Sequence, residues 1–226
     1  MKTKDEMFQA GAAIAERFCT SNGIPIPTID RLNPSQRNYH IGTCAYYRPT
    51  TIHIMVEKCA NRGFGGRAWS WPGYTVDRTP YGVIQHELGH HVDGIKTGEV
   101  TRENVIEKLF SKRIWEQSRE APLTGYLGTD KQTATFWMEW FAENFRLFVT
   151  NPNLCWMLRP RFYETVMAHG IEPILLDDWE GVLLLNGAPS RIVEQARKKI
   201  GAVKVSPLNA IANPQDQVSD MASLFT

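Results

Sequence analysis

The sequence has no long apolar run and no large excess of charge of either sign. No apolar stretch approaches the roughly 20 residues that a transmembrane helix needs. The first residues, Met-Lys-Thr-Lys-Asp-Glu, lack the apolar segment of a secretory signal peptide, so we expect cytoplasmic synthesis, with later export by another route left open. A formal net charge of +1 over 226 residues provides no basic footprint. We therefore expect neither a nucleic acid nor a membrane as partner.

Cysteine is also scarce, and none of it falls in a metal-binding or redox pattern. The four residues Cys19, Cys44, Cys59 and Cys155 are scattered, with no Cys-x-x-Cys pair. This excludes a zinc knuckle and a disulfide framework, and it favours buried thiols in a reducing compartment. The glycine-rich stretch 62–67 lacks the Lys-Ser/Thr of a phosphate-binding loop, so we expect a flexible loop there.

One short motif indicates a specific chemistry, the segment His86-Glu87-Leu88-Gly89-His90. Two histidines four residues apart on a helix share one face and can bind one Zn²⁺. The glutamate between them is placed to take a proton from a metal-bound water. From the chain's own composition the pattern is expected by chance roughly 0.01 times. The motif therefore predicts a zinc site with Glu87 as general base.

The flanking residues predict a helix around this motif. Thr79-Pro80 is typical of an N-cap followed by proline in the first turn, and Gly94 is a candidate stop signal. At 100° per residue, His86, His90 and Asp93 lie within about 60° of one another. The opposite face is expected to pack on a core; it comprises Ile84, Leu88, Val92 and Ile95.

Two further residues of this helix are assigned to structure. Gly89 has no side chain on the helix face that carries the two histidines, so another element can approach there. His91 points towards the apolar side, and we interpret it as structural and not as a ligand. Catalytic zinc usually takes three protein ligands, so one more residue has to come from elsewhere.

The third ligand is expected from residues 133–150, which are apolar almost all round a helical wheel. The exceptions form one stripe: Glu139, Ala142, Glu143 and Arg146. Carboxylates on a buried helix are costly unless they are paired or bound to metal. A buried Glu–Arg pair accounts for one of the two glutamates and leaves the other as a candidate ligand.

The two motifs together resemble the gluzincin metallopeptidases of the anthrax lethal factor type, a group that includes the Pro-Pro endopeptidases. The resemblance covers about residues 80–150 and rests on His-Glu-Leu-Gly-His-His-Val-Asp and Glu-Trp-Phe-Ala-Glu-Asn-Phe-Arg-Leu. It implies that Glu139 ligates zinc and that Glu143 supports a ligating histidine. It also implies an oxyanion-stabilising tyrosine, for which Tyr126 is the nearest equivalent although it lies further upstream; an ordinary loop tyrosine is the alternative. Residues 145–163 also resemble uncharacterised phage-encoded proteins.

Asp93 is the remaining acidic candidate near the metal. In some zinc peptidases an aspartate after the second histidine is the third ligand, usually beyond a glycine turn that this chain lacks. Three ligands along one helix would span too much of its axis to close a tetrahedron. We expect Asp93 to bind an imidazole by a hydrogen bond, or else to be a plain carboxylate at the helix end.

The rest of the chain predicts a small mixed sheet and several helices. Strands are expected at 39–47 and 51–56, with His53 facing outward, and an edge strand at 68–76 that an extended peptide could join. Helices are expected at 4–19, 101–116, 160–170 and 189–200. Residues 1–201 are then one α+β domain with a zincin-like fold: a small mixed sheet packed on the active-site helix and a helical C-terminal half. Residues 202–226 form an extended arm that could bind an assembly partner.

These observations predict a zinc-dependent endopeptidase that acts on a protein or peptide substrate. Zinc activates a water, and Glu87 accepts its proton. The alternative is a structural or assembly protein, for example of a phage virion, that uses the zincin fold as a binding module.

Overall fold

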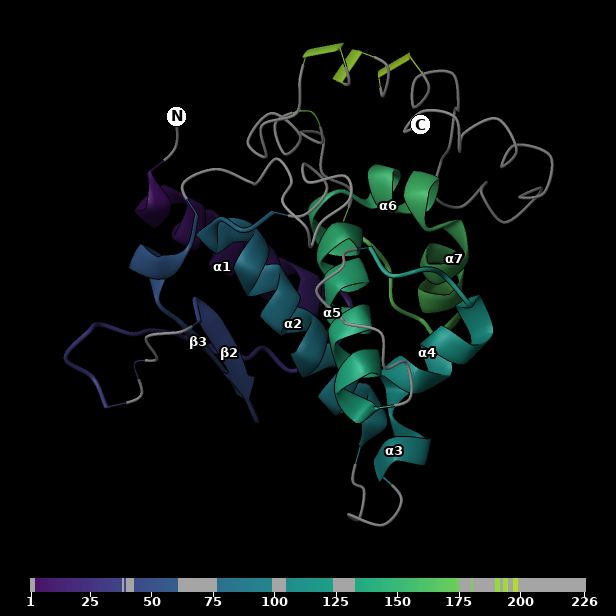
Figure 1. Cartoon of the computed structure of the whole chain (residues 1–226), viewed down its shortest axis with the longest axis horizontal. Coiled ribbons are helices and arrows are strands. Elements are labelled where there is room, and N and C mark those ends of the chain that lie inside the picture. Colours follow the sequence, from purple (N-terminus) through teal and green to yellow (C-terminus); the bar gives the residue numbers. More distant parts are fainter. Residues whose placement is uncertain are drawn as a thin grey trace.

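The helix that carries the two histidines, α2 (Pro80–Thr97), packs against α1 (Lys4–Ser21), against a small sheet and against α5 (Ala134–Thr150), as Figure 1 shows. The computed structural model describes residues 3–37, 39, 43–60, 77–98, 105–123, 133–174, 180, 190–191, 193–194 and 197–198. Its other elements are β1 (Thr28–Arg31), β2 (Ala45–Arg48), β3 (Thr51–Ile54), η1 (Val56–Lys58), α3 (Val105–Lys108), α4 (Phe110–Ser118), α6 (Pro152–Leu158) and α7 (Pro160–Ala168). The mixed α+β class is as expected. None of the helices in these ranges is both long and apolar enough to cross a bilayer.

The sheet has three strands in the order β1-β3-β2. β1 is parallel to β3 and β2 is antiparallel to it, so the sheet is mixed, as predicted. The predicted strand 51–56 is confirmed over Thr51–Ile54, whereas the predicted strand 39–47 shortens to Ala45–Arg48 among the described residues. β1 was not predicted. It is only four residues long, and Pro25 and Pro27 precede it.

The prediction that His53 faces outward is wrong. Its side chain lies on the opposite face of β3 from the buried Ile52 and Ile54, but only 9% of the residue is exposed. Tyr46 stacks on the imidazole with ring centroids 4.7 Å apart, and Nδ1 lies 3.2 Å from Oδ2 of Asp30. Neighbouring strands therefore cover this histidine.

The N-terminal end of α2 is as predicted, whereas its C-terminal end is not. Thr79 is the N-cap and Pro80 the first helical residue, as expected. The helix does not stop at Gly94 but continues to Thr97, and Gly98 follows with a φ of +72°, which glycine adopts without strain. A hydrogen bond from outside the helix stabilises this extra turn: the amide of Phe110 donates to Oγ1 of Thr97 over 2.9 Å. Ile95, expected in the core, is 40% exposed.

The C-terminal half begins with α5, whose first turn is capped by Thr133 through a 3.1 Å hydrogen bond from the amide of Phe136. Asn151 ends α5, as predicted, and its side chain caps α6, which was not predicted. The predicted helix 160–170 is confirmed as α7. The predicted helix 101–116 is interrupted at Leu109, so that α3 and α4 are separate.

Several predictions concern segments that lie wholly or partly outside the described residues. These are the loop 62–67, the edge strand 68–76, the residues 101–104 and the arm 202–226. In the predicted helix 189–200, the residues that are described are helical: 190, 191, 193, 194, 197 and 198.

The closest approach of α2 and α5 is at Gly89. A Cβ placed on Gly89 would lie 2.7 Å from Cα of Ala142 and 3.3 Å from Cβ of Phe145. Only the absence of a side chain lets the two helix backbones come this near. The approach continues into the aromatic core, where Phe145 packs edge-on against Phe18 and stacks on Phe141. The predicted role of Gly89 is therefore confirmed.

Substituting Gly89 with alanine tests this packing. In an open helix the change stabilises by up to about 1 kcal/mol. At Gly89 we expect a net destabilisation of about 1–3 kcal/mol, because the new methyl group overpacks the α2–α5 contact. Gly94→Ala is the matched control in the same helix, since the nearest atom to its new Cβ is Oη of Tyr47 at 3.9 Å. Urea denaturation of both variants should give shifts of opposite sign; equal shifts would contradict the account.

Candidate metal centre

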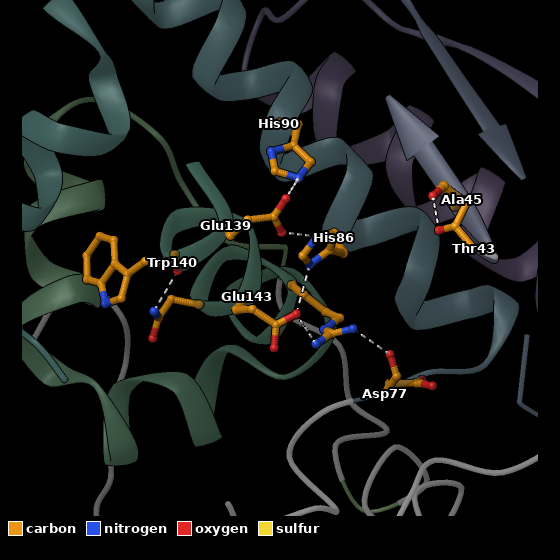
Figure 2. A network of polar contacts seen from close by, with 10 residues as sticks. Thr43, Ala45, Asp77, His86, His90, Glu139, Trp140 and Glu143 are labelled. Atoms are coloured by element: carbon orange, nitrogen blue, oxygen red, sulfur yellow. Dashed lines mark hydrogen bonds and ion pairs between the residues drawn. The ribbon is translucent and has the colours of Figure 1, made fainter. Parts of the chain in front are cut away.

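Three side chains from two helices converge on one point. Nε2 of His86 lies 3.2 Å from one carboxylate oxygen of Glu139, and Nε2 of His90 lies 3.5 Å from the other. Figure 2 shows both imidazoles of α2 turned towards the Glu139 carboxylate of α5. The potential ligand atoms all lie within 4.8 Å of one another, the only such group of three or more among the described residues. These three residues could hold a metal ion.

The spacing of these atoms suits a small tetrahedral ion. Two ligand atoms that are each 2.0–2.1 Å from a tetrahedral centre are about 3.3–3.4 Å apart. The nitrogen–oxygen separations of 3.2 and 3.5 Å are close to that value, each measured to a different oxygen of Glu139. The four-residue interval in α2 places His86 and His90 on one face, with ring centroids 5.0 Å apart and nearly perpendicular. The donor set, two imidazoles and a carboxylate, therefore fits a metal.

Glu143 contacts the other side of the His86 ring. Its Oε1 lies 2.9 Å from Nδ1 of His86 and also accepts a hydrogen bond from Nη2 of Arg146. Nη1 of Arg146 donates in turn to the carbonyl oxygen of Asp77 over 3.1 Å, and Figure 2 shows the resulting chain. Glu143 and Arg146 are both 4% exposed. A carboxylate on the second nitrogen fixes the orientation of a ligating imidazole, as the resemblance implied for Glu143.

The electrostatics of the metal-free cluster show how strongly these groups are coupled. Burial alone would lower the pKa of His86, but its contacts with Glu139 and Glu143 outweigh burial and raise that pKa to about 10. Burial would raise the pKa of Glu139, whereas the hydrogen bonds from His86 and His90 lower it overall. Without a metal, therefore, a protonated imidazole compensates the buried carboxylates. When the imidazoles are neutral, a metal cation would supply the positive charge that compensates the Glu139 carboxylate.

Glu87 lies beside the three candidate ligands and is not one of them. It is 7% exposed, and burial raises the pKa of its carboxyl group, with the charges of His86 and His90 acting in the opposite direction. Glu87 lines the same cavity as the ligands. A carboxyl group with a raised pKa is better suited to accept and return a proton than an ordinary one.

The three ligands open on a cavity of about 880 Å³. One wall is formed by α2 and α5, and another by the segment Thr43–Tyr47, which contains most of β2. Among the described strands, β2 is at the edge of the sheet next to the ligands. The cavity is large enough for an extended ligand and not only for an ion and its water.

The prediction that Asp93 forms a hydrogen bond with an imidazole is wrong. Oδ1 of Asp93 accepts hydrogen bonds from the amide of Ser111 over 2.7 Å and from Oγ1 of Thr97 over 3.4 Å. Nδ1 of His90 is buried and has no hydrogen-bond partner. The first amides of a helix have no partner within it and attract a carboxylate, so Asp93 binds the start of α4 instead of the metal centre.

His91 is structural, as predicted. Its Nε2 lies 2.6 Å from the carbonyl oxygen of Pro25 and its Nδ1 lies 3.2 Å from Oη of Tyr47. Burial lowers the pKa of His91, so the neutral ring links α2 to β2 and to the segment before β1. Tyr126, the candidate oxyanion donor, lies outside the described residues.

Asp77 is a supporting residue that the sequence analysis missed. Its carbonyl oxygen holds Arg146, and its Oδ1 accepts from both the amide and Oγ1 of Thr79, over 2.8 and 2.6 Å. A Cβ on Gly82 would lie 2.3 Å from the Asp77 side chain, so the first turn of α2 fits closely around it. An aspartate two residues before a helix N-cap is the signal that could have indicated this role.

Comparison of the chain with family models, curated proteins and solved structures finds no significant match. The resemblance to the gluzincins thus rests on the two sequence motifs alone.

The two glutamates should contribute unequally to metal affinity. Glu139→Gln removes the charge of the carboxylate whose two oxygens face the two histidines, and it should weaken metal binding the more. Glu143→Gln leaves the three ligands in place and should cost about 10–100-fold in affinity, as the loss of a carboxylate behind a ligating histidine typically does. Competition with a chromophoric chelator measures both. A larger loss for Glu143→Gln would contradict the assignment of Glu139 as ligand.

Proposed function

We propose that this protein is a zinc-dependent endopeptidase with a zincin-like fold. The observation that carries the proposal is the convergence of His86, His90 and Glu139, with the buried carboxyl group of Glu87 in the same cavity. The small mixed sheet beside α2 and the helical half that supplies Glu139 are the arrangement expected for such a fold.

Zinc is the metal that this donor set favours. Two imidazoles and one carboxylate are nitrogen and oxygen ligands that Zn²⁺ takes in catalytic sites, where a fourth position stays open for water. Magnesium and calcium prefer sites built almost entirely from oxygen. The three ligands line an open cavity, so a fourth position is accessible.

The chain's own residues would then share the work as follows. When held by His86, His90 and Glu139, zinc would supply a water of lowered pKa and polarise the scissile carbonyl. Glu87 would accept the proton of that water and pass it to the leaving amine. Glu143 holds the His86 ring through Nδ1, and Arg146 pairs with Glu143 in a buried position. An oxyanion donor completes the set, and Tyr126 remains the predicted one.

A peptide is the substrate that the cavity suits best. An extended chain can pair with an exposed strand edge while its side chains occupy neighbouring pockets. β2 is an edge strand of the described sheet and lines the cavity next to His86 and His90. A peptide bound along β2 would bring its backbone past the metal ligands.

The first test is metal content. Protein purified without chelator should contain one zinc per chain, and His90→Ala should lose it. His53→Ala is a matched control, because His53 is also buried but lies outside the cluster. Plasma emission spectrometry after dialysis gives the stoichiometry. A wild-type protein that neither contains zinc nor takes it up would overturn the proposal.

The second test separates catalysis from metal binding. Glu87→Gln keeps the size of the side chain and removes the base, so zinc should be retained while cleavage of a mixed peptide library falls by about 10²–10⁴-fold. Mass spectrometry of the library gives the rate and the cleaved bond. Unchanged cleavage would exclude Glu87 as the base. Zinc binding by the wild type without any cleavage would favour the alternative, a binding module in an assembly.

A further inference from the structure

Two of the four cysteines lie together at the wall of the metal cavity. Cys44 precedes β2 and lines the cavity, whereas Cys59 follows η1 and is 3% exposed. Both thiols are free. Sγ of Cys59 lies 4.0 Å from the carbonyl oxygen of Cys44 and 3.7 Å from that of Met55. The sulfur of Cys59 is therefore close to the backbone of Cys44, as a disulfide between the two residues requires.

Backbone hydrogen bonds hold the two cysteines in register. The amide of Met55 donates to the carbonyl oxygen of Cys44 over 2.8 Å, which extends the pairing of β2 and β3 beyond the strands. The amide of Cys59 donates to Val56 over 3.2 Å. The pair therefore closes the open end of the β2–β3 hairpin, opposite the turn at Pro49–Thr50.

The two thiols are chemically unequal. Cys44 is reached from the cavity, whereas Cys59 is 3% exposed. Interaction between the two thiols lowers the pKa of Cys44 and, together with burial, raises the pKa of Cys59. A peroxide in the cavity meets Cys44 first, so Cys44 is the attacking residue and Cys59 the resolving one. Burial raises the pKa of both Cys19 and Cys155, that of Cys19 to about 11, and these two are inert by comparison.

We propose that Cys44 and Cys59 are a dithiol modification site, oxidised by hydrogen peroxide to a disulfide in the wall of the metal cavity. The Cys44 thiolate attacks the peroxide oxygen, an S–O bond forms as the O–O bond breaks, and one water leaves. Sγ of Cys59 then attacks the sulfenic sulfur, an S–S bond forms and a second water leaves. Two thiols are oxidised and one peroxide is reduced to two waters.

The dithiol site does not depend on peptide cleavage. Oxidation of the two thiols would change the metal cavity in two ways. Oxidation removes the cavity-facing thiolate, whose charge interacts with His86, Glu87 and Arg146. It also locks the end of β2 that lines the cavity to the residue after η1. Because neither effect requires zinc or a substrate, the modification can be tested even if the proposed function is wrong.

The test is peptide mass mapping of the full chain after treatment with hydrogen peroxide and alkylation. We expect a cross-linked Cys44–Cys59 peptide that has lost two hydrogen atoms and is restored by dithiothreitol, while Cys19 and Cys155 remain alkylated. In untreated protein at pH 7, iodoacetamide should modify Cys44 at least about tenfold faster than Cys19, because of its larger thiolate fraction. Oxidation of Cys44 to sulfinic acid without a cross-link, or equal oxidation of Cys19, would overturn the proposal.

Two serine variants separate the roles of the pair. In Cys59→Ser the resolving thiol is gone, so peroxide should leave a sulfenic acid at Cys44 that dimedone traps. In Cys44→Ser, Cys59 should stay reduced at the same dose because it is buried. Circular dichroism identifies a variant that fails to fold. In that case the presence or absence of the Cys44–Cys59 cross-link in the wild-type protein decides whether the proposal holds. A dimedone adduct on Cys59 in folded Cys44→Ser would contradict the assignment of Cys44 as the attacking residue.

Discussion

The close contact of α2 with α5 at Gly89 and Ala142 is the constraint on which the candidate site depends. The two histidines lie on one helix and the third ligand on the other, so the ligand atoms converge only if the helix backbones nearly touch. Gly89 is three residues after His86, and Ala142 is three residues after Glu139. The contact thus lies about one turn from His86 and from Glu139, and directly beside His90. Packing of the aromatic residues of α5 against the core then holds the two helices in register.

A buried polar chain extends this constraint to the start of α2. It runs from the Asp77 backbone through Arg146 and Glu143 to His86. Charged groups are buried at a cost that is offset only when each has a partner of opposite charge or a hydrogen bond. The chain meets that condition and also fixes the ring of a ligand. Stability and the orientation of the site are therefore coupled in the same residues.

The sequence predicted the centre of the molecule better than its periphery. The histidine spacing and the acidic stripe on a buried helix are local patterns, and each depends on helix periodicity alone. Gly89 was predicted for the same reason, because a glycine in a metal-facing stripe signals a close approach. The end of α2 was predicted too early, since the contact of Thr97 with α4 outweighs the modest cost of Gly94 inside a helix.

What the sequence could not supply were contacts between distant segments. Asp93 binds Ser111, a residue on another helix that no spacing rule connects with it. The strand β1 is too short to show a pattern, and it forms because β3 provides a partner. Cys44 and Cys59 appeared scattered in the sequence, yet the fold brings Sγ of Cys59 within 4.0 Å of the carbonyl oxygen of Cys44. In each case a tertiary contact decided the structure where local propensity was weak.

The most direct test of the account is a crystal structure of the protein grown with zinc, with diffraction data collected at the zinc absorption edge. The account predicts one anomalous peak between α2 and α5, about 2.0–2.1 Å from Nε2 of His86 and of His90 and about 2.0–2.2 Å from an oxygen of Glu139. A peak bound by Glu143 or Asp93 with Glu139 turned away, or no peak between these helices, would contradict it.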